Sequence, residues 1–259
     1  MRHFRQLLIV GLAATACLIV GVSTASAHAE WSSKNATCAG GVIAPGDYGV
    51  LKITGICIIP GGKVVVRDRL SIGPNAALDA ATQAPTLIVY GNVSVARNGI
   101  FLLGCSAAFS PPCPSGVTTK DVIDGNVVAV GALALIFHSN IIRGNITQIG
   151  GGGGVNCDPN TTLQGSPVYS TFEDDWIGGR VLVKGYQSCW FGLIREHVHG
   201  SVILRNNTLA DPDAMEVVTN TIKGNLRCSG NSPAPQVGDS GGQPNVVFGK
   251  KTGQCASIQ

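Results

Sequence analysis

Carboxylate and amide side chains recur at one position of a sequence repeat, and residues of these types could perform chemistry. They stand four residues before successive glycines of the repeat, and they are Asp121, Asn140, Asp175, Glu196 and Asn220. If successive repeats stack as neighbouring parallel strands, Asp175 and Glu196 lie about 5 Å apart. Two carboxylates at that separation repel by about 3.5 kcal/mol at an effective dielectric of about 20. The pair therefore needs a shared proton, Arg195, a histidine or a calcium ion to neutralise it.

A catalytic interpretation assigns this column and its charged neighbours to the cleavage of a polysaccharide. Glycoside hydrolysis needs two carboxylates at a set separation, and a lyase needs a base and a cation. The candidate catalytic residues are Asp174, Asp175, Arg195, Glu196 and His199. The structural alternative is that the column caps turns, because Asn and Asp bond to nearby backbone and tolerate left-handed conformations. No cofactor is predicted, and calcium is kept only as one means of neutralising the acid pair.

Two tryptophans flank the acid column and are candidate ligand-binding residues. Trp176 follows Asp175 directly, and Trp190 stands shortly before Glu196. Their large flat rings could form a platform on which sugar rings stack. The alternative for both is packing in the core or a cap beside Cys189.

The repeat that positions these residues is a pentad in which two aliphatic residues enclose a glycine. The first copy is Val89-Tyr90-Gly91-Asn92-Val93. The later glycines follow at steps of 34, 19, 35, 21 and 24 residues, and they are Gly125, Gly144, Gly179, Gly200 and Gly224. A period near 20 residues, lengthened twice by an insert with cysteine, indicates a stacked repeat architecture.

A unit of about 20 residues cannot cover its own apolar face, but stacked units bury a continuous aliphatic column. We therefore predict an all-β fold, a right-handed parallel β-helix, because crossovers between parallel strands are usually right-handed. Residues 28–259 are expected to form one domain of about ten coils with disulfide-clipped loops. The five consecutive glycines at 150–154 predict a flexible hinge at the start of the second insert.

Eight cysteines remain beyond the N-terminal apolar run, and an even number in an exported chain indicates disulfides. They are Cys38, Cys57, Cys105, Cys113, Cys157, Cys189, Cys228 and Cys255. Eight cysteines allow 105 connectivities, so the pairing stays open. The simplest scheme joins neighbours in the sequence: 38 with 57, 105 with 113, 157 with 189, and 228 with 255. The sequence contains no Cys-x-x-Cys pair, so the alternative that these cysteines bind a metal is not favoured.

Residues 1–27 have the pattern of a secretory signal peptide. Two arginines precede an apolar run at 7–22, and Ala25-Ser26-Ala27 offers small residues for cleavage. Lipoprotein processing at Cys17 is an open alternative. No other segment is long enough to span a bilayer, and a net charge of +1 after cleavage gives no basic footprint for nucleic acid. We expect a secreted protein, extracellular or at the cell surface, of open oligomeric state.

The repeat, the N-terminal signal and the closing stretches 224–231 and Gly253-Gln254-Cys255 resemble uncharacterised secreted bacterial proteins of the right-handed β-helix type. The resemblance implies the pectate-lyase-like superfamily fold, which includes polysaccharide lyases and hydrolases as well as adhesins and inert scaffolds. Asp174-Asp175 followed by His199-Gly200 is loosely similar to polygalacturonases. However, no glycine precedes His199, and the Asn-Thr-Asp and Arg-x-Lys elements of that family are missing. Fold alone does not settle function.

The predicted function is a structural or binding surface without turnover, with extracellular or cell-wall polysaccharide as the candidate partner. The alternative is a polysaccharide lyase or glycoside hydrolase that uses the acid pair on a face of the β-helix. The two hypotheses differ in whether polysaccharide is cleaved, and in whether Asp175 and Glu196 face an open groove.

Overall fold

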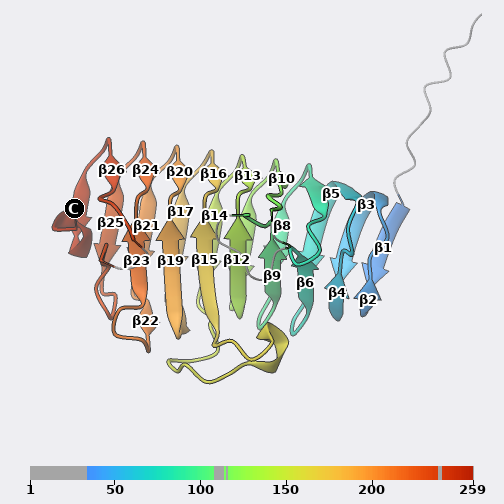
Figure 1. Cartoon of the computed structure of the whole chain (residues 1–259), viewed down its shortest axis with the longest axis horizontal. Coiled ribbons are helices and arrows are strands. Elements are labelled where there is room, and N and C mark those ends of the chain that lie inside the picture. The colour runs from blue at the N-terminus through green and yellow to red at the C-terminus, as the bar shows by residue number, and fades with distance from the viewer. Residues whose placement is uncertain (1–33, 108–113, 115, 239–240, 259) are drawn as a thin grey trace, which may run out of the picture. The chain divides into compact units, whose positions relative to one another are not determined.

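The computed structural model describes residues 34–107, 114, 116–238 and 241–258. In this part of the chain every pairing between named strands is parallel, and consecutive coils stand side by side along one axis (Figure 1). Residues 32–259 cluster as one compact unit. The predicted all-β parallel β-helix is confirmed. The predicted signal peptide at 1–27 and the domain start at residue 28 lie outside the described residues.

The described strands form a large sheet of 17 strands, a small sheet of eight and a pair. The large sheet contains β1 (Lys34–Cys38), β3 (Gly46–Ile53), β5 (Lys63–Ile72), β7 (Thr86–Val89), β8 (Val93–Val95), β10 (Val122–Ile123), β11 (Val127–Val130), β13 (Ile141–Ile142), β14 (Ile146–Ile149), β16 (Trp176–Ile177), β17 (Val181–Lys184), β20 (His197–Val198), β21 (Val202–Arg205), β24 (Thr221–Ile222), β25 (Leu226–Ser229), β26 (Val246–Val247) and β27 (Lys251–Gly253). The small sheet contains β2 (Gly41–Val42), β4 (Ile56–Ile58), β6 (Ala77–Ala80), β9 (Ile100–Leu103), β12 (Ala134–His138), β15 (Tyr169–Glu173), β19 (Trp190–Ile194) and β23 (Met215–Val218). The pair is β18 (Gln187–Ser188) with β22 (Thr208–Leu209).

The glycine pentads form one corner of the stack, where the large sheet bends between two of its strand columns. The two aliphatic ends of each pentad pair with the same positions on the next coil, as Val127 does with Ile146 and Ile123 with Ile142. A Cβ atom on Gly144 would lie 2.3 Å from the carbonyl oxygen of the glycine one coil before. The predicted vertical register of the pentads is therefore confirmed, and glycine is required by the close approach of the two backbones.

Asparagines beside these glycines hydrogen-bond from coil to coil. The backbone N–H of Asn126 donates to Asn92 Oδ1 at 2.8 Å, and that of Asn145 donates to Asn126 Oδ1 at 2.9 Å. The sequence pattern missed a further corner, at which Gly249 packs on the carbonyl oxygen of Gly224. It was missed because Lys251, not an aliphatic residue, closes that pentad.

Aliphatic side chains from all three strand columns fill the interior, together with a row of stacked phenylalanines from the small sheet. Phe101, Phe137, Phe172 and Phe191 are buried, with successive ring centroids 5.3, 5.4 and 5.9 Å apart. Each comes from the next coil, so the row binds successive coils of the small sheet to one another.

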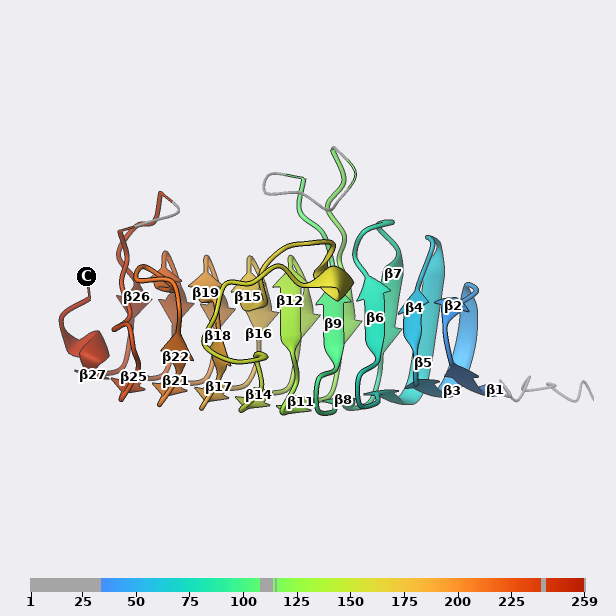
Figure 2. The ribbon, with the colours of Figure 1, turned by 90° about the horizontal axis from the view of Figure 1, so that it is seen from below.

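In the insert at residues 150–168, the chain after the glycine run leaves the stack and folds against the outer side of the small sheet (Figure 2). It contains the one-turn helix η1 (Thr161–Leu163), where Asn160 accepts hydrogen bonds from the N–H groups of Thr162 and Leu163. Leu163 and Val168 pack on apolar side chains that point outward from β9 and β12, including Ile100 and Ile136. The insert therefore covers part of the sheet's outer face.

The glycine run at the start of this insert is packed as part of a coil, which disagrees with the predicted flexible hinge. The N–H of Gly152 donates to the carbonyl oxygen of Ala132 at 3.0 Å, and the carbonyl oxygen of Gly151 accepts from Gln187 at 3.0 Å. A Cβ on Gly152 would lie 2.1 Å from Gln187 O. Five glycines occur here because the backbone threads between two coils with positive φ angles.

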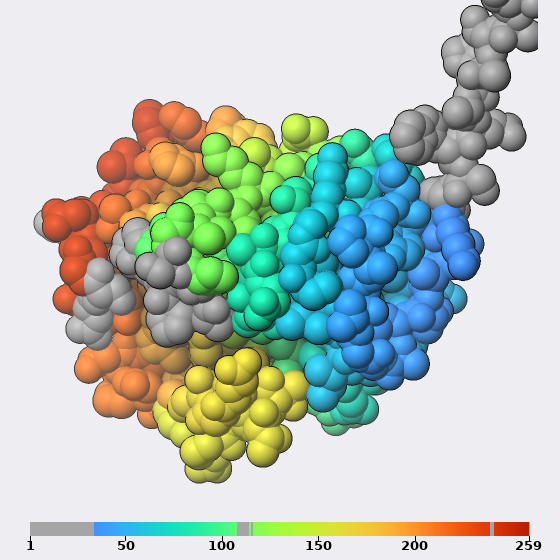
Figure 3. Space-filling view, turned by 45° about the vertical axis from the view of Figure 1, so that its right-hand side comes forward, coloured from blue at the N-terminus to red at the C-terminus, as the bar shows by residue number. Residues whose placement is uncertain are grey.

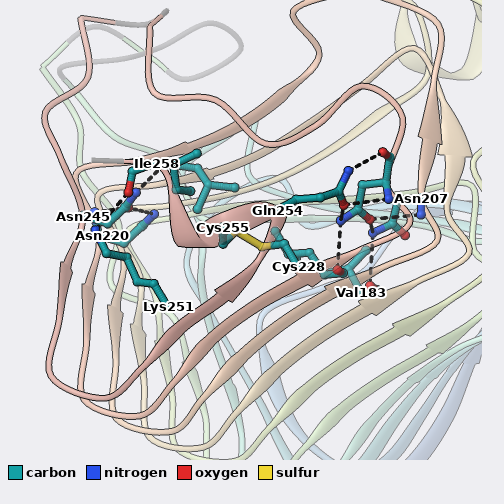
Figure 4. The surroundings of a disulfide bond; sticks show 12 residues. Val183, Asn207, Asn220, Cys228, Asn245, Lys251, Gln254, Cys255 and Ile258 are labelled. Atoms are coloured by element: carbon teal, nitrogen blue, oxygen red, sulfur yellow. Dashed lines mark hydrogen bonds between the residues drawn. A yellow bond between two sulfur atoms is a disulfide. The ribbon is translucent and has the colours of Figure 1, made fainter.

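Three of the predicted neighbour disulfides are present: Cys38–Cys57, Cys157–Cys189 and Cys228–Cys255. Cys113 lies outside the described residues, so its predicted bond with Cys105 stays a prediction. The last disulfide ties β25 to the terminal one-turn helix η2 (Gln254–Ala256), beside a ladder of amides (Figure 4). In that ladder Asn207 donates to Asn231 and Asn231 donates to Gln254.

The contrast between two glycines tests the corner packing. We expect Gly144→Ala to lower the free energy of unfolding by about 3 kcal/mol, because the new methyl group would overlap a backbone carbonyl. Gly185→Ala is the control: its φ is +68°, but the nearest atom to the new Cβ would be Gly150 N at 4.0 Å, which is an ordinary contact. It should cost only about 1 kcal/mol for the left-handed backbone. Equilibrium denaturation measures both values, and a smaller loss for Gly144→Ala than for Gly185→Ala would contradict the corner geometry.

Candidate functional site

The acid and amide column lies at the corner where the small sheet passes into the large sheet, and its side chains are buried. Asp175, Glu196 and Asn220 have no exposed surface. Each side-chain oxygen accepts from the backbone N–H one coil earlier: Asn140 N to Asp175 Oδ1 at 2.7 Å, Asp175 N to Glu196 Oε1 at 3.0 Å and Glu196 N to Asn220 Oδ1 at 2.8 Å. The column is thus a hydrogen-bond ladder between coils, and Asn245 continues it.

The predicted neighbours Asp175 and Glu196 do lie on adjacent coils, but away from solvent. Burial raises the pKa of both carboxyls well above their ordinary range, and the nearby charge of Asp175 raises that of Glu196 further. Burial also raises the pKa of Asp121 to about 7. Asp175 Oδ2 and Glu196 Oε2 have no hydrogen-bond partner among the described residues. The protonated forms are therefore favoured, and neither group can touch a ligand on the surface.

The residues before four successive ladder positions have a left-handed backbone and project their side chains outward; they are Ser139, Asp174, Arg195 and Thr219. Asp174 has φ of 59° and Arg195 has φ of 56°. Arg195 Nε lies 2.8 Å from Asp174 Oδ1, and its Nη2 lies 3.0 Å from Glu173 Oε2. His138 Nδ1 lies 3.8 Å from the same Glu173 oxygen. The structure thus divides the predicted catalytic set, with Asp174 and Arg195 outside and Asp175 and Glu196 inside.

His199 and the two tryptophans lie apart from this charged cluster. Trp176 on β16 is 38% exposed, and its ring centroid lies 4.9 Å from that of His199 on the next coil. Trp190 begins β19 in the small sheet, where its ring meets Tyr169 edge-on at 6.0 Å. The two tryptophans therefore belong to different sheets and do not form one platform.

A pocket of about 220 Å³ opens between the insert and the outer side of the small sheet, and we call it the insert pocket. Its apolar wall is formed by Leu102, Ile136 and Leu163, and His138 and Tyr169 also line it. The insert protrudes from the surface as a separate lobe (yellow in Figure 3). Side chains of β12 alternate between two directions. Ile136 and His138 point outward into the pocket, and Leu135 and Phe137 point inward to the core.

The sequence pattern missed His138, Tyr169 and Glu173 as site residues. These residues occupy outward positions of β12 and β15 in the small sheet. Identifying them requires the register of that sheet, and the glycine repeat gives the register of the large sheet only. The one available signal was Glu173 directly before Asp174.

Burial and charge set the protonation of the surface cluster. Burial lowers the pKa of His138 although Glu173 and Asp174 raise it, so the imidazole is neutral near pH 7. Burial likewise raises the pKa of the Tyr169 phenol, which stays protonated. We call His138, Tyr169, Glu173, Asp174 and Arg195 the Glu173 cluster. It offers hydrogen-bonding groups and the Arg195 guanidinium, which Glu173 and Asp174 already bind.

No protein-family model matches the chain, and no curated protein or solved structure is significantly similar to it. Membership of the pectate-lyase-like superfamily therefore stays a prediction. Within the described residues, no group of three or more His, Cys, Asp or Glu side chains could hold a metal ion, and calcium also stays untested. No helix in this part of the chain is long and apolar enough to cross a membrane.

The buried acids predict that stability falls as pH rises. Their folded-state pKa values are raised, so their contribution is complete below the unfolded pKa of about 4 and is lost as pH rises through the folded values. Replacing both members of the pair, Asp175→Asn with Glu196→Gln, should flatten the decline and raise the unfolding free energy at pH 8 by about 2 kcal/mol.

Chemical denaturation between pH 4 and 9 measures this effect. Asp124→Asn is the matched control, because Asp124 forms an exposed pair with Arg143 at 2.8 Å. Parallel loss of stability with pH in the wild type and the double variant would show that these acids are ionised in the folded protein.

Proposed function

We propose that this protein is exported and serves as a glycan-binding surface without turnover, with its ligand on the outer face of the small sheet. The insert pocket carries the proposal, because an apolar wall there meets neutral polar groups beside the half-buried rings of Tyr169 and Trp190. Small-ligand sites have this composition: a mostly apolar concavity with a few polar groups that fix orientation. Sugars match it because each ring has apolar faces and a rim of hydroxyls.

Aromatic side chains support a saccharide ligand in particular. Tyr169 lines the pocket, and Trp190 stands next to it with its indole N–H donating to Glu216 Oε1 at 3.2 Å. The hydrogen bond and the edge-on contact with Tyr169 hold the half-buried indole in one orientation. A fixed ring loses little conformational entropy when a sugar packs against it.

Export is supported by the disulfides and by the N-terminal signal pattern. Three disulfides form in the described residues, and such bonds persist in oxidising compartments. The charged fraction is only 13%, and backbone hydrogen bonds repeat from coil to coil. Both features suit a stable extracellular protein.

A polysaccharide-cleaving enzyme is the second candidate, and the Glu173 cluster is the observation that favours it. Glu173 lies within 4 Å of both a guanidinium and an imidazole, so a carboxylate, a cation and a base meet at the surface. The buried Asp175 and Glu196 would act only as structure in such an enzyme. New reducing or unsaturated ends that appear with the wild type, and vanish with Glu173→Gln, would establish it.

Aromatic substitutions test the binding proposal. After a glycan array identifies a ligand, Tyr169→Ala and Trp190→Ala should each weaken its affinity about tenfold in calorimetric titration. Tyr90→Ala is the control, because Tyr90 is 46% exposed at the glycine corner, away from the small sheet. Binding of no glycan, or an equal loss with Tyr90→Ala, would contradict the assignment.

A further inference from the structure

We propose that the insert pocket selects one uncharged saccharide unit, a neutral hexose or an N-acetylated sugar, and excludes uronic acid and sulfated units. This inference rests on the proposed function and names the ligand class of the same site. It follows from which groups line the pocket, which groups border it, and how large it is.

The lining is neutral. Among the described residues that line the pocket there is no Lys, Arg, Asp or Glu. Its polar groups include the hydroxyls of Thr82, Ser166 and Tyr169 and the amide of Gln164. Hydroxyls donate and accept, and an amide does both with separate atoms, so these groups match sugar hydroxyls and N-acetyl groups.

The border of the pocket is acidic on two sides. On one side Asp79 accepts a hydrogen bond from the hydroxyl of Thr82, a lining residue. On the other side Glu173 lies 3.8 Å from His138, which also lines the pocket. An anionic ligand group entering here would meet carboxylates of its own sign.

The cations near this border do not offset it. Arg195 is held by Asp174 with bonds of 2.8 and 2.9 Å and by Glu173 at 3.0 Å. Lys120 stands at the same corner one coil before Ser139, and its ammonium is exposed, so the high dielectric of water weakens its attraction even at low salt. Recognition of a carboxylate or sulfate needs a basic side chain aimed at it, and the lining provides none.

The size of the pocket limits the ligand to about one unit. Its volume of about 220 Å³ is below the range of about 300 to 1,000 Å³ that holds drug-sized ligands. The Cys157–Cys189 disulfide ties the insert to the start of β19, which keeps the insert side of the pocket in place. A longer chain would place one unit in the pocket and extend over the outer face toward Trp190.

Calorimetric titration with matched oligosaccharides tests the selectivity. Oligomers of N-acetylglucosamine or of glucose should bind the wild type at least about tenfold more tightly than oligogalacturonate of equal length at low salt. Tighter binding of oligogalacturonate would overturn the neutral-ligand inference and leave the glycan-binding proposal standing. Binding of neither class, nor of other array glycans, would overturn both.

Charge variants test the physical cause. Glu173→Gln with Asp174→Asn removes two carboxylates that neutralise the Arg195 guanidinium, so the preference for neutral ligands should shrink about tenfold. Asp124→Asn with Asp47→Asn is the matched control, because these residues form exposed pairs with Arg143 and Arg67. An unchanged preference in the test variant would contradict an electrostatic cause.

Salt provides a test that needs no substitution. Raising ionic strength from about 0.01 M to about 1 M shortens the screening length from about 30 Å to about 3 Å. The wild-type preference for neutral over acidic oligosaccharides should fall severalfold over this range. A preference that does not change with salt would overturn the acidic-border explanation even if the double variant fails to fold.

Discussion

The close approach of successive backbones at the glycine corners is the constraint on which the rest of the structure depends. At Gly144 and Gly200 the space for a Cβ atom is taken by the carbonyl oxygen of the previous coil. Parallel hydrogen bonds then hold each coil in one register over the next. Each residue of a paired strand therefore has a counterpart about 4.8 Å away along the axis, and the direction of its side chain is shared along its column.

This register explains why charged residues adjacent in sequence have different roles. A left-handed residue turns the chain between the two sheets, so Asp174 projects outward while Asp175 points into the ladder. The inward acids join coils by accepting backbone N–H groups. The outward groups lie beside the insert pocket, where we propose that their charge selects the ligand. The two sides of the same corner thus hold side chains of different kinds: buried ladder groups inside and charged groups at the surface.

The sequence predicted the repeat, the parallel β-helix and three of the disulfide pairs, because each depends on local spacing. It also placed Asp175 beside Glu196, but it could not show on which side of the wall they lie, because that depends on a backbone angle one residue earlier. The insert pocket could not be predicted, since it forms where Leu163 packs on strands distant in sequence. The glycine run was misinterpreted because threading between coils and flexibility both favour glycine.

Carboxyl footprinting tests the central claim most directly, namely that the ladder acids Asp175 and Glu196 are inside and the neighbouring Asp174 is outside. The folded protein would be treated with a carbodiimide and an amine at neutral pH, and the modified residues located by tandem mass spectrometry. We predict rapid modification of exposed carboxyls such as Asp68 and Asp213, slower modification of Asp174, which Arg195 holds, and none at Asp175 or Glu196 until the chain unfolds. Modification of Asp175 and Glu196 at the rate of Asp174 in the folded protein would contradict it.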